Sequence, residues 1–181
     1  MNTALYTIAA LVALAAVYLV LSPLLRIYLR YRGQRVVTCP ETQAPAGVEV
    51  DAAAAAVSAF GEPRLRLRDC SRWPEREACG QECLRQIESA PADCLVRNIL
   101  ARWYEGKSCV VCGRPLGNID WVNHRPALLS PENITFEWKD LSPESIHQAL
   151  ENHRPVCWNC HVAATFRREH PDLVVERPRK T

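Results

Sequence analysis

The chain has 181 residues, with 22 basic and 20 acidic side chains and nine cysteines. Its formal net charge of +2 excludes the strongly basic surface that is typical of general nucleic-acid binding. Nine cysteines cannot all pair as disulfides, so metal ligation is the expected use of most of them.

The first predicted element is a membrane-spanning helix at residues 4–25. These 22 residues carry no charged side chain, and a helix of that length crosses a hydrocarbon core of about 30 Å. A cleaved signal peptide would begin with basic residues and end at a small-residue cleavage site, and the sequence shows neither feature. We therefore expect an uncleaved anchor, which Ser22 and Pro23 bend or end.

Basic residues on only one side of this segment predict its orientation. The segment is followed by Arg26, Arg30, Arg32 and Arg35, and no lysine or arginine precedes it. Positive charge is retained on the cytoplasmic side, so we expect a single-pass protein of the cytoplasmic membrane, N-out and C-in. Removing these four from the 22 basic residues leaves 18 against 20 acidic ones, so nucleic acid is not an expected partner of the soluble part. The sequence identifies no small-molecule substrate.

A cysteine-rich α/β module is expected at residues 34–92, after the anchor and its basic flank at residues 1–33. Three short strands are predicted, at residues 36–39, 47–50 and 65–69. Asp51 is the expected N-cap of an alanine-rich helix. A second helix over residues 75–89 would place Cys79 and Cys83 one turn apart on one face.

A second module is expected at residues 93–181, giving an α+β chain overall. Apolar residues at helical spacing predict a helix over 95–103, and alternation predicts a hairpin with strands around Ile119 to Trp121 and Ile134 to Trp138. Ser142, Pro143 and Glu144 would start a short helix that ends near residue 150. The last helix is predicted from the CWNCH sequence to about residue 169, before a proline.

Two CxxC pairs predict a zinc site in the second module. The pairs are Cys109 with Cys112 and Cys157 with Cys160, and Gly113 allows the first turn to curl around a metal. The order CVVCGRPL, hairpin, CWNCH and helix resembles a treble-clef zinc finger. Four thiolates make a closed structural site, so this resemblance implies zinc but no catalysis. The whole arrangement also resembles bacterial membrane-anchored cysteine-rich proteins, a likeness that implies no activity.

The first module carries a candidate second metal site. Its members are Cys39, Cys70, Cys79 and Cys83. Two of them share one predicted helix and the other two end predicted strands, so loops could bring all four together. Zinc, an iron–sulfur cluster and metal-free buried thiols all stay open for this set. The role of Cys94 is not assigned.

CWNCH also matches the attachment motif of c-type haem. In that alternative Cys157 and Cys160 would bind the haem covalently, His161 would be the proximal ligand, and the protein would be an electron carrier. The soluble part would then lie outside the cytoplasm, against the orientation that the arginines predict.

A further alternative is a nuclease, because the sequence NHRP at residues 123–126 resembles the start of the catalytic motif in HNH-type nucleases, which share the treble clef. His124 would then be a general base.

The sequence has no GxSxG, no HExxH and no glycine-rich phosphate loop. We therefore expect no catalytic residue, and predict a zinc-stabilised module that binds a protein partner in a membrane complex, with Trp121, His124, Phe136 and Trp138 as its contact surface.

Overall fold

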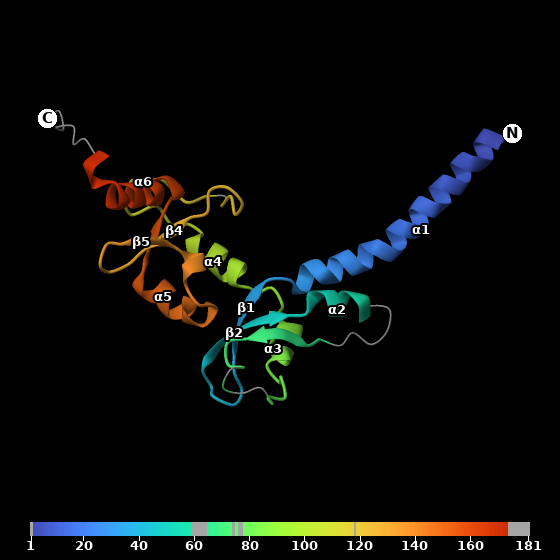
Figure 1. Cartoon of the computed structure of the whole chain (residues 1–181), viewed down its shortest axis with the longest axis horizontal. Coiled ribbons are helices and arrows are strands. Elements are labelled where there is room, and N and C mark those ends of the chain that lie inside the picture. The colour runs from blue at the N-terminus through green and yellow to red at the C-terminus, as the bar shows by residue number, and fades with distance from the viewer. Residues whose placement is uncertain (1, 59–64, 74, 76–77, 118, 174–181) are drawn as a thin grey trace. The chain divides into compact units, whose positions relative to one another are not determined.

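The computed structural model describes all residues except 1, 59–64, 74, 76–77, 118 and 174–181 (Figure 1). The described chain is a mixture of helices and short antiparallel strands, as expected for an α+β protein. It divides into two compact units, Met1–Val96 and Arg97–Thr181, and each is described here by itself.

The first unit begins with one long apolar helix, α1 (Asn2–Tyr31). It is long and apolar enough to cross a membrane, although a signal sequence or a core helix can also meet this criterion. Its apolar stretch is not buried inside the protein. The prediction that the helix might end at Pro23 is wrong, because α1 continues for eight residues beyond it to Tyr31. A proline removes one helical hydrogen bond, and the apolar turns on both sides keep theirs.

The sequence analysis counted Arg35 among the basic residues that flank the apolar segment, but Arg35 is not exposed there. Its side chain is fully buried, and its guanidinium donates hydrogen bonds to four backbone carbonyls, two in the last turn of α1 and two in the linker that follows it. Helix C-termini carry partial negative charge and unpaired carbonyls, which a cation satisfies well. The side chain therefore joins the end of the helix to the first strand of the unit.

A three-stranded antiparallel sheet forms the body of the first unit. Its strands are β1 (Gln34–Thr38), β2 (Pro45–Val50) and β3 (Leu67–Cys70), in the order β1-β2-β3. All three were predicted within a few residues. In the pairing of β1 with β2, Val36 lies opposite Gly47. In the pairing of β2 with β3, the register shifts between Glu49 and Val50.

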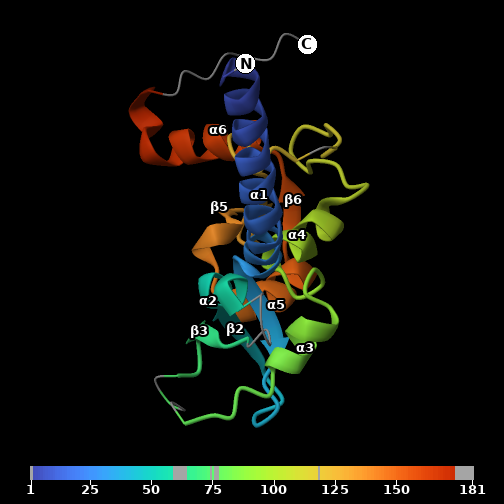
Figure 2. The same ribbon diagram turned by 90° about the vertical axis from the view of Figure 1, so that its right-hand side faces the viewer.

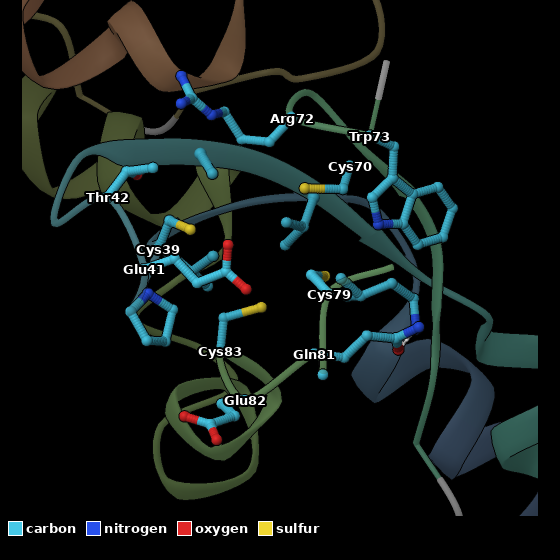
Figure 3. A pocket seen from close by; sticks show the side chains of 16 residues that line it. Cys39, Glu41, Thr42, Cys70, Arg72, Trp73, Cys79, Gln81, Glu82 and Cys83 are labelled. Atoms are coloured by element: carbon cyan, nitrogen blue, oxygen red, sulfur yellow. Dashed lines mark hydrogen bonds between the residues drawn. The ribbon is translucent and has the colours of Figure 1, made fainter. Parts of the chain in front are cut away.

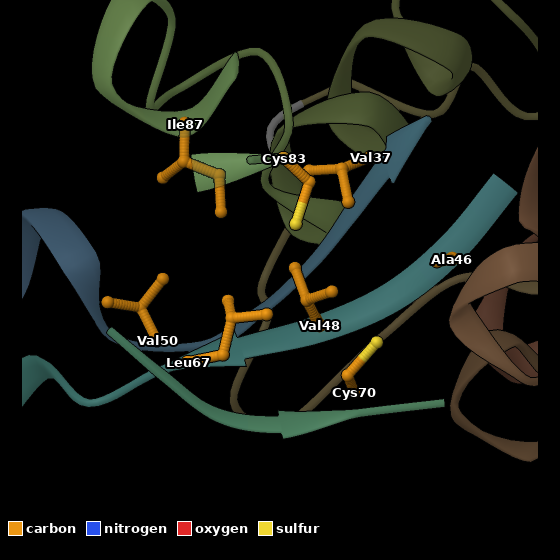
Figure 4. Packing of buried hydrophobic residues seen from close by; sticks show 8 residues of the cluster. All are labelled: Val37, Ala46, Val48, Val50, Leu67, Cys70, Cys83 and Ile87. Carbon is orange, nitrogen blue, oxygen red and sulfur yellow. The ribbon is translucent and has the colours of Figure 1, made fainter. Parts of the chain in front are cut away.

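Two short helices cover this sheet. α2 (Ala52–Val57) begins at the predicted N-cap Asp51, whose side chain accepts a hydrogen bond from the backbone N–H of Ala54 at 2.9 Å, and it packs beside the C-terminal part of α1 (Figure 2). α3 (Leu84–Ser89) places Ile87 over the apolar face of the sheet (Figure 4).

The predicted helix over residues 75–89 is wrong in its first half. Only its end, α3, is helical among the described residues, while 74, 76 and 77 lie outside them. Gln81 has a φ of +54°, and its side-chain oxygen accepts a hydrogen bond from the N–H of Leu67 in β3. This tertiary contact overrides helix propensity, so Cys79 and Cys83 do not share a helical face.

Among its described residues, the second unit contains three α-helices and a second sheet. Its elements are α4 (Val96–Tyr104), β4 (Ala127–Leu129), β5 (Thr135–Glu137), α5 (Ile146–Asn152), β6 (Arg154–Val156) and α6 (Trp158–Glu169), with single 3-10 turns at Trp138–Asp140, Pro143–Ser145 and Pro171–Leu173. The sheet order is β5-β4-β6, all antiparallel. α4, α5 and α6 confirm the predicted helices.

The predicted hairpin is wrong in its first strand and incomplete. Ile119 to Trp121 belongs to a turn region, and the strand that pairs with β5 is β4, several residues later. β6 was not anticipated at all. It pairs with the edge of β4 that β5 leaves free. Because β6 ends at Val156, directly before Cys157, it brings the second CxxC pair to the sheet. Tyr104 of α4 reaches this sheet, where its hydroxyl donates to the carbonyl of Ala127 at 2.9 Å.

Candidate metal centre

Four cysteine sulfurs converge in the second unit. Cys109 and Cys112 come from the turn after α4, and Cys157 and Cys160 from the start of α6. All four Sγ atoms lie within 4.8 Å of one another, and those of Cys112 and Cys157 are 3.8 Å apart. Among the residues that the structure describes, this is the one such group of cysteine, histidine and acidic side chains, and its members are those the CxxC spacing predicted.

The first pair sits on a tight backbone turn. The N–H of Cys109 donates to the carbonyl of Arg114, and the N–H of Gly113 donates to the carbonyl of Cys109, both at 2.8 Å. Gly113 has a φ of +73°, a conformation that side chains with a Cβ rarely adopt. The N–H of Val110 also donates to Pro155 in β6 at 3.0 Å, which fixes the turn beside the second pair.

The second pair sits at the N-terminus of α6. Cys157 is the N-cap residue with extended backbone, and Cys160 follows in the first turn. Neighbouring turns of a helix put these two side chains on the same side. Cys109 and Cys157 are buried together with Leu129 and Val156, whereas Cys160 is half-buried and Cys112 is exposed. The sulfur cluster therefore lies at the edge of the core of this unit.

The thiols differ in how readily they ionise. Burial alone would raise the pKa of Cys109, but backbone N–H groups of Cys157, Cys112 and Val111 donate to its sulfur and lower its pKa to about 6. Burial and the adjacent thiols raise the pKa of Cys160, and burial raises that of Cys157. One thiolate is therefore favoured, and its charge opposes further ionisation unless a cation compensates for it.

This arrangement suits a soft metal ion. Four sulfur ligands in a tetrahedral set are typical of zinc or iron, and they leave no coordination position for a water molecule or substrate. The cluster therefore has the donors and the spacing of a structural metal site, whereas the identity of the ion is not fixed by the geometry.

His161 lies next to the cluster but faces away from it. Its side chain is buried, and its Nδ1 is 3.0 Å from the hydroxyl of Thr135 in β5. Burial lowers its pKa, so the imidazole is neutral at physiological pH. The haem alternative requires Cys157 and Cys160 without the first pair, whereas the structure gives them Cys109 and Cys112 as immediate neighbours.

His124 is exposed on a turn, and its partner is a residue that the sequence analysis missed. Asp120 accepts backbone N–H groups from Val122 and Asn123, and its second oxygen is 3.4 Å from Nδ1 of His124. Those N–H groups lower the pKa of the Asp120 carboxyl, so it stays ionised. An aspartate at the first position of a turn, which accepts the N–H groups two and three residues later, is the signal that could have revealed this pair.

The aromatic residues predicted as a contact surface are mostly engaged within the unit. Trp121 and Trp138 are half-buried, and their rings meet edge to face at 6.1 Å between centroids. The half-buried ring of Phe136 packs in the same way against His153 at 5.2 Å. Only His124 of the predicted surface is exposed.

The four cysteines of the candidate second site line one cavity in the first unit (Figure 3). Cys70 and Cys83 are buried, and Cys39 and Cys79 are half-buried. Burial raises the pKa of Cys83 to about 11, and the thiols of Cys70 and Cys79 add to this effect. Cys94 does not line this cavity.

No family model, no curated protein and no solved structure matches the chain. Function is therefore argued from the geometry of these sites.

Proposed function

We propose that the chain is a membrane-anchored protein whose second unit is a zinc-stabilised module that binds a partner protein and has no catalytic activity of its own. The observation that carries this proposal is the convergence of four thiols within 4.8 Å. They occur in a chain that begins with a long, exposed apolar helix. A set of four thiolates holds a fold together and leaves no position for chemistry on the metal.

Zinc is compatible with the spacing of the sulfurs and is the ion we propose. Zn–S bonds of about 2.3 Å place the sulfurs of a tetrahedral site about 3.8 Å apart. The observed distance between Cys112 and Cys157 is 3.8 Å. A turn carrying one CxxC pair, the β4–β5 hairpin and a helix that starts at the second pair support the inference of a treble-clef architecture.

The N-terminal helix supports a membrane location with the N-terminus outside. Arg26, Arg30 and Arg32 remain exposed after the apolar stretch, although Arg35 is occupied by the helix end. Three arginines on one side against none on the other still favour retention of that side in the cytoplasm.

A surface for the partner is offered by α6 rather than by the predicted aromatic residues. Trp158, Val162 and Phe166 recur every four residues on this helix, and Val162 and Phe166 are 44% and 47% exposed. They line a shallow groove that Arg167 also lines. An apolar protein segment with an acidic residue at one end complements this groove in shape and charge.

The experiment is affinity purification of the full chain from its native membrane in mild detergent. We expect a stoichiometric protein partner that is lost on Val162→Asp or Phe166→Asp while the zinc content stays constant. Val122→Asp is the matched control, because Val122 is an exposed valine of the same unit outside the groove. Equal loss in the control, or recovery of the chain alone, contradicts the proposal.

A second candidate function is hydrolysis of a nucleic-acid phosphodiester, and the Asp120–His124 pair favours it. An ionised carboxylate beside Nδ1 orients an imidazole so that Nε2 can accept a proton. His124 and Asp120 line an open pocket together with Asn159 of α6. Divalent-metal-dependent cleavage of DNA that disappears in His124→Ala, with zinc retained, would establish it. Absence of cleavage by the intact protein removes it.

A further inference from the structure

We propose that Cys39, Cys70, Cys79 and Cys83 bind a second zinc ion in the first unit. This site is independent of the centre in the second unit and of the function proposed for it. Three separate segments of the unit supply the ligands: the turn after β1, the end of β3 and the chain that leads into α3.

The four thiols surround a single space. They line a cavity of about 210 Å³, and Figure 3 shows the sulfur atoms of Cys39, Cys70 and Cys83 directed into it with Cys79 at its edge. The rest of the wall is mixed. It includes apolar residues such as Val37 and Val48 and the charged residues Glu41, Arg72 and Glu82. Four soft thiol ligands favour a thiophilic ion over a hydrated one.

The turn that carries Cys39 repeats the turn that carries Cys109. The N–H of Cys39 donates to the carbonyl five residues later at 2.9 Å, and the N–H of Gln43 returns to the carbonyl of Cys39 at 2.8 Å. In the metal centre the same two bonds join Cys109 to Arg114 and Gly113 to Cys109, both at 2.8 Å. The fourth residue after the cysteine has positive φ in both turns, +55° and +73°.

Backbone N–H groups also point at the sulfurs in the manner of a metal-thiolate site. The sulfur of Cys39 receives the N–H groups of Glu41 and Thr42, and that of Cys109 receives those of Val111 and Cys112, which occupy the same positions in the turn. Such bonds stabilise sulfur as an anionic ligand. Thr42 replaces the second cysteine of the turn, so the remaining ligands have to come from elsewhere in the unit.

A purely apolar role does not account for this arrangement. Cys70 and Cys83 pack with Val48 and Leu67 in the core, as buried free thiols commonly do (Figure 4). The turn at Cys39 and the position of Cys79 on the cavity wall need another explanation. The four sulfurs are spaced more widely than those of the second unit, and the described residues 78–83, which include Cys79, form no helix or strand.

The test counts metal in the full chain purified in detergent. We expect two zinc equivalents per chain, falling to one in Cys39→Ser and in Cys79→Ser. Cys94→Ser is the matched control, because this half-buried cysteine of the same unit does not line the cavity, and it should keep two equivalents. One equivalent in the unsubstituted chain overturns the proposal, and so does iron with sulfide and visible absorption, which would make the site a cluster.

A second measurement covers variants that fail to fold. In the unsubstituted protein, Cys39 and Cys79 should resist alkylation until a chelator is added, as read by mass spectrometry of each peptide. The centre at Cys109 provides the internal reference, because it should become reactive under the same treatment. Reaction of Cys39 and Cys79 at full rate before chelation contradicts the second site, whatever happens at Cys109.

Discussion

Nδ1 of His161 lies 3.0 Å from Oγ1 of Thr135, and both side chains are buried. This contact ties α6 to β5 one residue after Cys160, so the helix that supplies two sulfurs is fixed to the sheet by a side-chain hydrogen bond. Groups behind metal ligands commonly hold those ligands in place.

Replacing Thr135 with valine keeps the shape of the side chain and removes this partner. We expect a loss of about 1 to 3 kcal/mol in the stability of the second unit, because a buried ring nitrogen is left without its hydrogen bond. Chemical denaturation followed by tryptophan fluorescence measures the loss. The exposed Thr38→Val serves as control, and equal stability of Thr135→Val would contradict a role for the contact.

Cys157→Ser should remove one zinc equivalent and unfold the second unit. The free energy of binding a structural zinc ion is about 10 to 16 kcal/mol and is also folding energy, so one lost ligand has a large effect. Metal analysis and hydrogen exchange across β4 and β6 measure the two consequences. Cys94→Ser is the control, and unchanged zinc content in Cys157→Ser refutes the assigned ligand set.

Zinc binding should weaken as the pH falls. The metal-free cluster favours protonated Cys157 and Cys160, whose pKa values are raised, so zinc must displace their protons. At least two displaced protons change the apparent affinity by about a hundredfold or more per pH unit, and Cys109 adds another below its pKa of about 6. Competition with a chromogenic chelator at several pH values measures this slope. An affinity independent of pH would contradict thiolate ligation.

Reporter fusions at the C-terminus should show an N-out, C-in topology. A reporter that works only in the cytoplasm is expected to be active, and one that works only in the periplasm inactive, because the exposed arginines after the apolar stretch stay inside. Replacing Arg26, Arg30 and Arg32 together with glutamine should weaken this preference. Activity of the periplasmic reporter alone would reverse the orientation and reopen the haem alternative.

Arg35→Lys should loosen the junction between α1 and β1. Lysine keeps the charge but lacks the planar fork that reaches several carbonyls, and hydrogen bonds to a charged group contribute about 1.5 to 3 kcal/mol each. Hydrogen exchange of the β1 amides should speed up. Arg32→Lys is the control, since Arg32 is exposed. Equal protection in both variants would show that the buried contacts are dispensable.

The four-cysteine cluster of the second unit could be predicted because CxxC spacing is a local property of the chain. The same holds for α2 with its cap at Asp51 and for α6. The strand β4 could not be found by alternation, because Ala127, Leu128 and Leu129 are all buried and show no period of two. Around Ile119 and Trp121 the pattern did alternate, but Asp120 hydrogen-bonds its own backbone there and forms a turn instead.

The first unit shows a different limit of sequence analysis. The turn at Cys39 lacks the second cysteine and the glycine that identify such turns, so its likeness to the turn at Cys109 exists only in the backbone hydrogen bonds. The start of α3 depends on a contact between Gln81 and β3, which brings together residues distant in sequence. Tertiary contacts of this kind carry no local signal.

The buried guanidinium of Arg35 also determines how the sheet of the first unit is connected to α1. Only Arg32 and Gly33 separate α1 from β1. Arg35 donates to the carbonyls of these two residues and, across them, to those of Arg30 and Tyr31 at the helix end. A linker without such contacts would let the sheet swing freely about the end of α1, whereas these hydrogen bonds couple the sheet to the helix. A tilt or rotation of α1 is thus passed to the sheet and to the cysteine-lined cavity.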